Sequence, residues 1–470
     1  MKNLSLDDYK SIILRRDPHY DGRLYFGVTT TKIYCRPVCP ARPKPENIVI
    51  YKSKSAAEKA GCRACLRCRP DLAPGNRFIQ PGKDIVRRCL NLMDETFPEH
   101  KSIETLATTL GISARHLRRV FAEQLGASPG EILKTQKIHF AKHLLLETRE
   151  SVSDIAFASG FTSIRRFNEA FKTAYRQTPS QIRTGKHSRQ HKGDKIQLSL
   201  MILPPYDFTS ILSFLKRHAA FGIEKVTDRY YERHVPQHNS YATFRVTINK
   251  KQDALLVDLQ GFKLQQLSGL LITIGRLFDR DHNPDHLPVT SQGKHPGVRV
   301  PGCFDPFETA VSIILSQLVS IAQATGKLAA LIQRFGSILD KKDVFRFPQP
   351  EQLMNAEIEK IGITRAKADA IRAIARLVHE QKIIFSYGAD FARTRKQLLA
   401  IKGIGPWTTE IMMMRCFGDP DAFPENDLFI KRALAQHSVD ENLWKTHRAY
   451  MTNYIWNQSR QNLSPGKKNG

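Results

Sequence analysis

Four cysteines near the start of the chain have the spacing of a metal site. Cys35 and Cys39 form one close pair, and Cys65 and Cys68 form a second. Two close pairs of thiolates from two loops are the usual way to build a tetrahedral Zn²⁺ site. Spacing alone is typical of a structural zinc site, which is chemically inert. We therefore expect Zn²⁺ as a cofactor, with Cys62 as an extra thiol that could compete for the metal.

The residues around these cysteines carry a family resemblance. The stretches Tyr34-Cys-Arg-Pro-Val-Cys-Pro40 and Ala60-Gly-Cys-Arg-Ala-Cys-Leu-Arg-Cys-Arg-Pro70 resemble the N-terminal zinc domain of the bacterial Ada adaptive-response family, over about residues 5–75. In that family, a four-cysteine zinc domain removes the methyl group from an alkylated DNA phosphate. The resemblance implies that Cys35 is the methyl acceptor and that Cys39, Cys65 and Cys68 are the other zinc ligands.

The chemistry of such a site agrees with this implied role. Zinc keeps a cysteine sulfur deprotonated at neutral pH, and four thiolates on Zn²⁺ leave a net charge of about −2, which makes a nucleophilic centre. Methylation of one ligand would reduce that charge to about −1 and weaken the repulsion from DNA phosphate. An irreversible repair step would therefore also act as a switch to tighter DNA binding.

The segment from Lys83 to Ile182 has helical apolar spacing and repeats itself. Each copy predicts a helix, a turn at Gly111 or Gly160, and an Arg-rich helix. Two such copies resemble the DNA-binding domain of AraC-type regulators, over about residues 84–183, which Ada proteins also carry. The resemblance implies that the second helix of each copy enters the major groove. The contact candidates are Arg115, His116, Arg118, Arg119, Ser163, Arg165, Arg166 and Asn168, and we expect more than half of them to touch only phosphate or solvent.

A second DNA-binding pattern lies near the C-terminus. Residues 398–408 predict a helix, a turn with Gly403 and Gly405 around Ile404, and a second helix. Backbone amides at a helix start suit a phosphate, and glycines allow its close approach. By itself this helix-hairpin-helix pattern indicates only sequence-independent DNA binding. Together with the downstream Asp427, it resembles the DNA glycosylases of the helix-hairpin-helix superfamily.

A more specific resemblance is to the AlkA-type 3-methyladenine DNA glycosylases, over about residues 198–460. It rests on the stretches 203–208, 229–233, 300–308 and 314–320. The resemblance implies that Asp427 is the catalytic carboxylate and that Leu318 fills the stack after a nucleotide is flipped out. On sequence alone, a leucine at helical spacing is usually a core residue, and an aspartate before a helix is usually an N-cap. Both alternatives stay open here.

Alkylation at N3 or N7 makes a purine cationic and a good leaving group, so no general acid is needed. Asp427 would then stabilise the oxocarbenium-like sugar and orient water.

Aromatic side chains that line a base pocket select a cationic base by cation–π contact. Trp407 is the best candidate for such a residue, with Trp444 and Tyr450 behind it, although each could be core. Trp407 stands where strand-cleaving relatives have a lysine, so we expect monofunctional hydrolysis. His447 stands where AlkA-type pockets have a tryptophan, which bears on the range of bases accepted.

Composition and patterning set the organisation of the 470-residue chain. Its net charge of +27 predicts a polyanionic partner. Asp7 and Asp8 argue against a signal peptide, and no apolar run is long enough for a membrane helix, so we expect a cytoplasmic protein.

The C-terminal half has both strand-like and helical patterns. β-like stretches at 195–202, 241–248 and 254–259 surround a helical stretch at 208–217, and Asp305 to Glu308 resembles a capping box. The polar segment 184–195 should be a flexible linker that isolates two cores.

We therefore expect a multidomain α+β fold. Its parts are a zinc methyl-acceptor domain (1–80), an all-α double helix-turn-helix domain (83–183), a basic linker (184–197), a β-rich α+β domain (198–300), an all-α helix-hairpin-helix glycosylase domain (301–460) and a disordered tail (461–470). The expected function is alkylation repair by methyl transfer and base excision, combined with transcriptional activation. The expected partners of a monomeric chain are double-stranded DNA and RNA polymerase, with no membrane. The alternatives are a pure regulator and a glycosylase that a structural-zinc module merely tethers to DNA.

Overall fold

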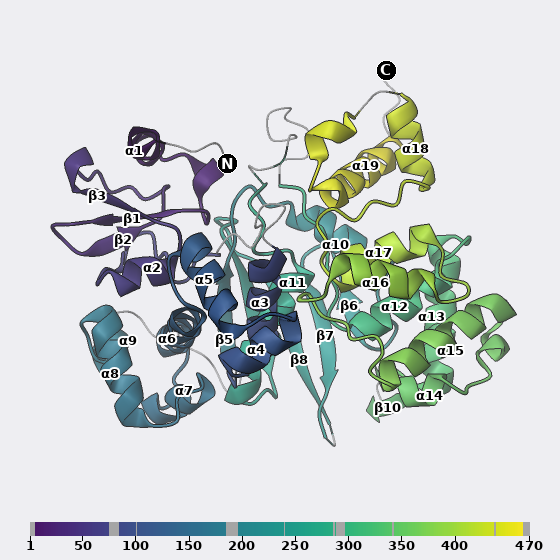
Figure 1. Cartoon of the computed structure of the whole chain (residues 1–470). Coiled ribbons are helices and arrows are strands. Elements are labelled where there is room, and N and C mark those ends of the chain that lie inside the picture. The colour runs from purple at the N-terminus through teal and green to yellow at the C-terminus, as the bar shows by residue number, and fades with distance from the viewer. Residues whose placement is uncertain are drawn as a thin grey trace.

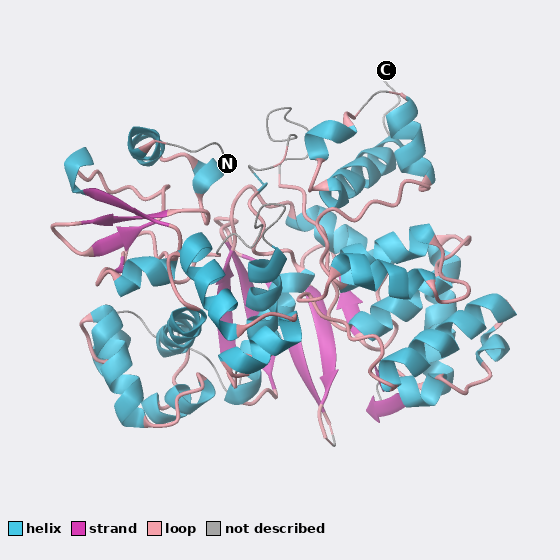
Figure 2. Cartoon of the chain, viewed as in Figure 1, coloured by secondary structure: helices cyan, strands magenta, loops and turns pink. Residues whose placement is uncertain are grey.

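The computed structural model describes residues 5–74, 84–99, 101–184, 196–238, 240–284, 287, 297–340, 343–436 and 439–463. Four units follow one another along the chain, and Figures 1 and 2 show them packed into one body. The fold is multidomain α+β, as predicted. Most of the expected linker and tail, residues 185–195 and 464–470, lies outside the described residues. No described helix has the length and apolar character needed to span a bilayer.

The first unit is a small α+β unit around the cysteines. Its sheet has the order β3-β1-β2-β4, in which β2 and β4 are parallel and the other neighbours antiparallel. Cys35 ends β2 and pairs with Phe26 of β1. Its elements are α1 (Leu6–Arg15), β1 (Tyr25–Val28), β2 (Ile33–Cys35), β3 (Ile48–Tyr51), α2 (Lys54–Lys59) and β4 (Arg63–Ala64).

The second unit is the predicted pair of helix-turn-helix segments. Serine side chains cap the start of five consecutive helices by accepting a backbone N–H of the first turn, which satisfies donors the helix cannot pair itself. Gly111 takes the left-handed conformation that ends the first helix of copy one. The helices are α3 (Asp84–Glu95), α4 (Ile103–Leu110), α5 (Ala114–Leu125), α6 (Pro129–Glu147), α7 (Val152–Ala158), α8 (Ile164–Tyr175) and α9 (Pro179–Thr184).

The third unit is an antiparallel sheet of order β5-β9-β8-β7-β6 with two helices. Alternating buried positions, such as Leu198 and Leu200, face the core, as a half-buried strand requires. The elements are β5 (Ile196–Met201), α10 (Phe208–Arg217), β6 (Glu224–Val226), β7 (Tyr231–Pro236), β8 (Tyr241–Ile248), β9 (Ala254–Gln260) and α11 (Leu267–Leu277).

The fourth unit is mainly helical. Asp305 caps its first helix through Phe307 and Glu308, but the predicted capping box is wrong, because the Glu308 carboxylate pairs with Arg233 of β7 instead. The elements are α12 (Pro306–Leu315), α13 (Ile321–Phe335), β10 (Ser337–Asp340), β11 (Val344–Arg346), α14 (Pro350–Leu353), α15 (Arg365–His379), α16 (Phe391–Leu399), α17 (Pro406–Cys416), α18 (Leu428–Ala435) and α19 (Arg448–Leu463).

The expectation that a linker isolates two cores is wrong. One hydrophobic cluster joins Tyr34 of the first unit, Ile138 of the second and Leu200 of the third. Helix α3 of the second unit also packs on α11 of the third. A polar linker sequence carries no information on whether the folded units that it joins have complementary surfaces.

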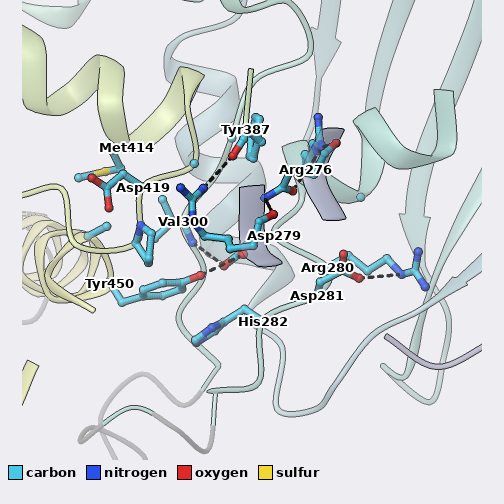
Figure 3. A pocket seen from close by; sticks show the side chains of 17 residues that line it. Arg276, Asp279, Arg280, Asp281, His282, Val300, Tyr387, Met414, Asp419 and Tyr450 are labelled. Atoms are coloured by element: carbon cyan, nitrogen blue, oxygen red, sulfur yellow. Dashed lines mark hydrogen bonds and ion pairs between the residues drawn. The ribbon is translucent and has the colours of Figure 1, made fainter. Parts of the chain in front are cut away.

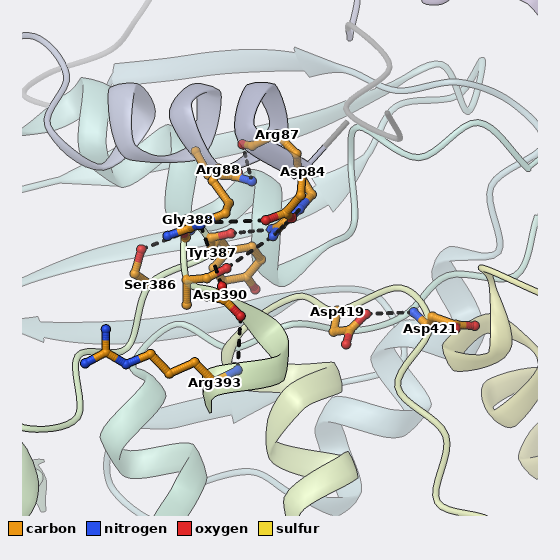
Figure 4. A network of polar contacts seen from close by, with 12 residues as sticks. Asp84, Arg87, Arg88, Ser386, Tyr387, Gly388, Asp390, Arg393, Asp419 and Asp421 are labelled. Carbon is orange, nitrogen blue, oxygen red and sulfur yellow. Dashed lines mark hydrogen bonds and ion pairs between the residues drawn. The ribbon is translucent and has the colours of Figure 1, made fainter. Parts of the chain in front are cut away.

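Helix α3 also docks on the loop that precedes α16 (Figure 4). Arg87 donates to the Tyr387 carbonyl at 2.8 Å, and Arg88 donates to the Gly388 carbonyl at 3.1 Å. Glu95 accepts the Tyr387 backbone N–H at 2.8 Å. The first helix of the helix-turn-helix unit is thus fixed against the start of the helical hairpin.

Gly388 offers a direct test of this docking. A Cβ atom on Gly388 would lie 2.7 Å from Cγ of Leu92 and 2.9 Å from the Arg88 carbonyl oxygen, so Gly388→Val forces α3 away. We expect a larger particle in small-angle X-ray scattering and a stability loss of about 1–3 kcal/mol from overpacking. Gly269→Val is the matched control, because a Cβ on Gly269 meets no atom within 4 Å outside the adjoining part of its own helix. An unchanged scattering profile for Gly388→Val would contradict the docking.

Candidate functional site

The structure brings the four predicted metal ligands together. The sulfur atoms of Cys35, Cys39, Cys65 and Cys68 all lie within 4.8 Å of one another, and all four side chains are buried. A tetrahedral site with Zn–S bonds of about 2.3 Å separates its sulfurs by about 3.8 Å. The four cysteines therefore fit Zn²⁺. Cys62 lies outside this cluster, with its sulfur 3.8 Å from the Tyr51 hydroxyl.

Arg36 joins the two ligand loops. Its guanidinium forms a buried ion pair with Asp21 and reaches the Cys68 carbonyl at 3.5 Å. Burial works against the Arg36 charge, but Asp21 outweighs it and the pKa of Arg36 is raised. The charged Arg36 guanidinium therefore lies between Asp21 and the Cys68 segment of the cysteine cluster.

Glu58 connects the cysteine cluster to the helix-turn-helix unit. Tyr34, the neighbour of Cys35, donates its hydroxyl to Glu58 at 2.9 Å. Glu58 also accepts the Thr135 hydroxyl at 2.8 Å and contacts the His139 ring nitrogen at 2.6 Å, both on α6. Burial opposes ionisation of Glu58, but these partners, His139 foremost, lower its pKa.

Asp71 makes a second connection, three residues after Cys68. Its carboxylate forms a buried ion pair with Lys142 of α6 and accepts the Tyr175 hydroxyl of α8 at 3.4 Å. Burial raises the pKa of Asp71, and Lys142 more than compensates, so the pKa is lowered overall. Residues close to the metal ligands therefore hold α6, which lies between the two copies, and α8 of the second copy.

The predicted DNA-contact residues lie on two helices, α5 and α8. Leu117 and Phe121 bury one side of α5, and Phe167 and Phe171 bury one side of α8. Among the predicted contact residues, His116 and the N-cap Ser163 are half-buried. The exposed candidates are Arg115, Arg118, Arg119, Arg165, Arg166 and Asn168.

Leu318 is fully exposed between α12 and α13, so the core alternative for it is wrong. Its backbone has φ +54, a left-handed conformation that is costly for a leucine and typical of functional sites. Gln317, which the sequence interpretation missed, donates to the Gly403 carbonyl and to the Thr408 hydroxyl, each at 2.9 Å. It therefore ties this loop to the helical hairpin.

The hairpin has the expected geometry. Gly403 has φ +90, and a Cβ there would lie 3.1 Å from Ala370, so this turn favours glycine. Gly403 and Gly405 are exposed, while Ile404 between them is buried. Gly405 is the N-cap of α17 and makes no side-chain cap, so its end of the helix can present backbone N–H groups to an anion.

Asp427 lies at the start of α18, close to the hairpin. It is the helix N-cap and accepts the backbone N–H groups of Phe429 at 3.0 Å and Ile430 at 3.4 Å. Two indole N–H groups also reach it, from Trp407 at 3.3 Å and from Trp456 at 3.2 Å. The structure therefore brings Trp407 to Asp427, and it adds Trp456, for which the sequence interpretation had no signal.

The other two pocket candidates make contacts elsewhere. Trp444 is buried against Tyr454, with ring centroids 5.8 Å apart. Tyr450 stacks on His282 at 3.9 Å and donates its hydroxyl to Asp279 at 3.1 Å, in a cavity of about 130 Å³ (Figure 3). Burial raises the pKa of Asp279 to about 7. The base-contact roles of Trp444 and Tyr450 stay predictions.

His447 lies beside the same stack, with its ring centroid 6.4 Å from that of His282. Burial lowers the pKa of His447, which favours the neutral ring. His447, which stands where AlkA-type pockets have a tryptophan, therefore favours the neutral imidazole. Its effect on the range of bases accepted stays a prediction.

Four family models match the chain in order. They are the metal binding domain of Ada (residues 8–71), a helix-turn-helix domain (106–185), the AlkA N-terminal domain (197–305) and the HhH-GPD superfamily of base excision DNA repair proteins (311–455). The order agrees with the four units of the structure.

Three curated relatives illustrate the similarity. A probable bifunctional transcriptional activator/DNA repair enzyme AlkA of Mycobacterium tuberculosis is 30% identical over 475 residues, 94% of each chain. The DNA-3-methyladenine glycosylase 2 of Escherichia coli is 30% identical over 266 residues, 54% of this chain and 94% of the relative. The bifunctional transcriptional activator/DNA repair enzyme AdaA of Bacillus subtilis is 29% identical over 191 residues, 40% of this chain and 88% of the relative.

Proposed function

Because the chain belongs to the family of bifunctional transcriptional activator/DNA repair proteins in which an Ada-type front half precedes an AlkA-type glycosylase, we propose that it excises alkylated bases from DNA and also accepts methyl groups from methylated DNA phosphates. The observation that carries the proposal is Asp427, whose carboxylate is oriented from two sides beside an exposed hairpin. The second activity rests on the four-cysteine cluster.

The glycosylase half divides the work of base excision among few residues. The amides of the Gly403–Gly405 turn hold a DNA phosphate, and Leu318 fills the gap that the flipped nucleotide leaves. Trp407 contacts the cationic base through its ring. The N3- or N7-alkylated purine leaves as a neutral base, while Asp427 stabilises the positive sugar and orients the water that attacks it. The proposed reaction is hydrolysis without strand cleavage.

The front half would carry out a single methyl transfer. The Cys35 sulfur forms a bond to the methyl carbon as the bond from that carbon to the phosphotriester oxygen breaks, which leaves an ordinary phosphodiester anion in DNA. Zinc, when bound, holds the four sulfurs as thiolates. Cys35, Cys39, Cys65 and Cys68 would supply the ligands, and Arg36, paired with Asp21, would hold the Cys68 segment in place.

A regulatory role follows from how the cysteine cluster is anchored. Glu58 and Asp71 link its flanking residues to α6 and α8, so a change at Cys35 would act on a helix-turn-helix unit that is in contact with the cluster's surroundings. The proposed outcome is tighter promoter binding and activation of transcription, with RNA polymerase as a partner of the monomeric chain. In the alternative proposal, zinc is structural and the front half only tethers a glycosylase to DNA.

Two assays on the full chain test these proposals. The abasic-site yield on alkylated duplex DNA measures excision, and mass spectrometry after exposure to methylphosphotriester DNA measures methylation of cysteine. Excision without methyl uptake would favour the tethered glycosylase, and methyl uptake without excision would leave a pure regulator. If folded protein showed neither excision nor methyl uptake, both halves of the proposal would be overturned.

DNA binding by the front half should appear in the salt dependence of affinity. We expect the triple variant Arg115→Ala, Arg119→Ala and Arg166→Ala to bind duplex DNA with a shallower slope of log affinity against log salt, by about 0.9 for each DNA phosphate that the variant no longer neutralises. Lys216→Ala, which removes an exposed lysine paired with Asp228, is the control. An unchanged slope in the triple variant would mean that α5 and α8 do not engage the DNA backbone.

A further inference from the structure

The two oxygens of the Asp427 carboxylate have different surroundings. Oδ1 accepts the Phe429 and Ile430 backbone N–H groups and the Trp456 indole N–H at 3.2 Å. Oδ2 accepts the Trp407 indole N–H at 3.3 Å, its single donor among the described residues. A carboxylate oxygen has about two lone-pair sites. Oδ1 is therefore filled, and Oδ2 keeps an acceptor site.

We propose that Trp456 is a positioning residue for base excision: its indole N–H fixes Oδ1 so that Oδ2 is the oxygen presented to the sugar and the attacking water. This inference rests on the proposed glycosylase function. It concerns a residue on α19, 29 positions after Asp427 in the chain.

A positioning residue is needed because the carboxylate of an aspartate can rotate about its terminal side-chain torsion. The terminal torsion of aspartate is broad, so a helix cap on one oxygen leaves the carboxylate plane loosely defined. The bonds from Phe429 and Ile430 come from the same helix turn and hold only Oδ1. Donors from two other helices, Trp407 on α17 and Trp456 on α19, hold the two oxygens separately and so fix the plane.

The two tryptophans have distinct tasks in this arrangement. Trp407 lies at the start of α17, next to the hairpin turn, where a ring can also contact the base. Trp407 donates to Oδ2, the oxygen that faces the sugar and the attacking water. This hydrogen bond can therefore change as positive charge develops on the sugar. Trp456 bonds the oxygen already held by the cap, and its ring packs against the hydrophobic core. A phenylalanine could supply that packing but not the N–H donor.

The test variant is therefore Trp456→Phe in the full chain. We expect single-turnover excision of 3-methyladenine from duplex DNA to fall roughly tenfold to a hundredfold, as a small misplacement of a catalytic group does. We expect affinity for the same duplex and the melting temperature to stay near the parent values. Tyr454→Phe is the matched control: it removes a polar group of a buried aromatic on the same helix, bonded to Gln458 rather than to Asp427.

A double-mutant cycle keeps the test decisive if Trp456→Phe also disturbs folding. With Asp427→Asn already present, Trp456→Phe should cause little further loss, because its effect acts through the missing carboxylate. An equal further loss would overturn the inference, as would parental excision by Trp456→Phe alone. Failure of the proposed function is a separate result, since the parent protein itself would then release no alkylated base.

Discussion

Cys35→Ser protein should take up no methyl group from methylphosphotriester DNA and should still excise alkylated bases at close to the parental rate. The nucleophile in the proposed transfer is a thiolate, and a serine hydroxyl does not ionise near neutral pH. Excision should persist because the hydrophobic core of the glycosylase unit and the cluster around Cys35 share no residue. The two activities can therefore be lost separately, even though the units are packed together.

The measurement is peptide mass spectrometry, which locates the methyl group on one cysteine of the parent protein. This matters because Cys35 is 2% exposed and Cys68 is 9% exposed, so exposure alone does not select Cys35. Cys62→Ser is the control, since its sulfur lies against Tyr51 outside the cluster. Methyl uptake by Cys35→Ser, or a methyl group on Cys68 of the parent, would refute the assignment. Excision by the same sample reports that the glycosylase unit of the variant is folded.

Sequence patterns among near neighbours in the chain were enough to predict many helices and strands and the metal site. The alternating stretch 241–248 is β8 and the amphipathic stretch 208–217 is α10, with the predicted bounds. Both patterns depend only on neighbours in the chain. The four cysteines could also be assigned to one site from their spacing, because few other arrangements place two close thiolate pairs in one small unit.

The sequence interpretation missed contacts that join distant parts of the chain. Trp456 reaches Asp427 only because α19 packs beside α18, and nothing near either residue in the sequence signals that contact. The docking of α3 on the Gly388 loop joins residues 300 positions apart. Leu318 was ambiguous for the opposite reason: its spacing suits a helix, but α12 ends at Leu315 and the backbone at Leu318 turns left-handed.

Asp427→Asn should bind alkylated duplex about as well as the parent and excise on the order of a hundredfold more slowly, or worse. Asparagine has nearly the same size and can still cap α18 through its oxygen. What it lacks is the negative charge, and preorganised charges of this kind supply several kcal/mol of transition-state stabilisation. The Trp456 bond adds a reason for the side chain to stay in place, since the asparagine oxygen can occupy the Oδ1 position.

The structure also predicts a modest cost in stability for this variant. With the asparagine oxygen at the Oδ1 position, its NH₂ group faces the Trp407 N–H, which donates to Oδ2 in the parent. Two donors then oppose each other, so a stability loss of about 1–3 kcal/mol is expected. If Asp427 were only a helix cap, asparagine would instead turn over normally and Asp427→Ala would lose about 1 kcal/mol of stability without a large loss of rate. Single-turnover release of 3-methyladenine and the melting temperatures of both variants separate these cases, and retained excision by Asp427→Asn would remove Asp427 from the active site.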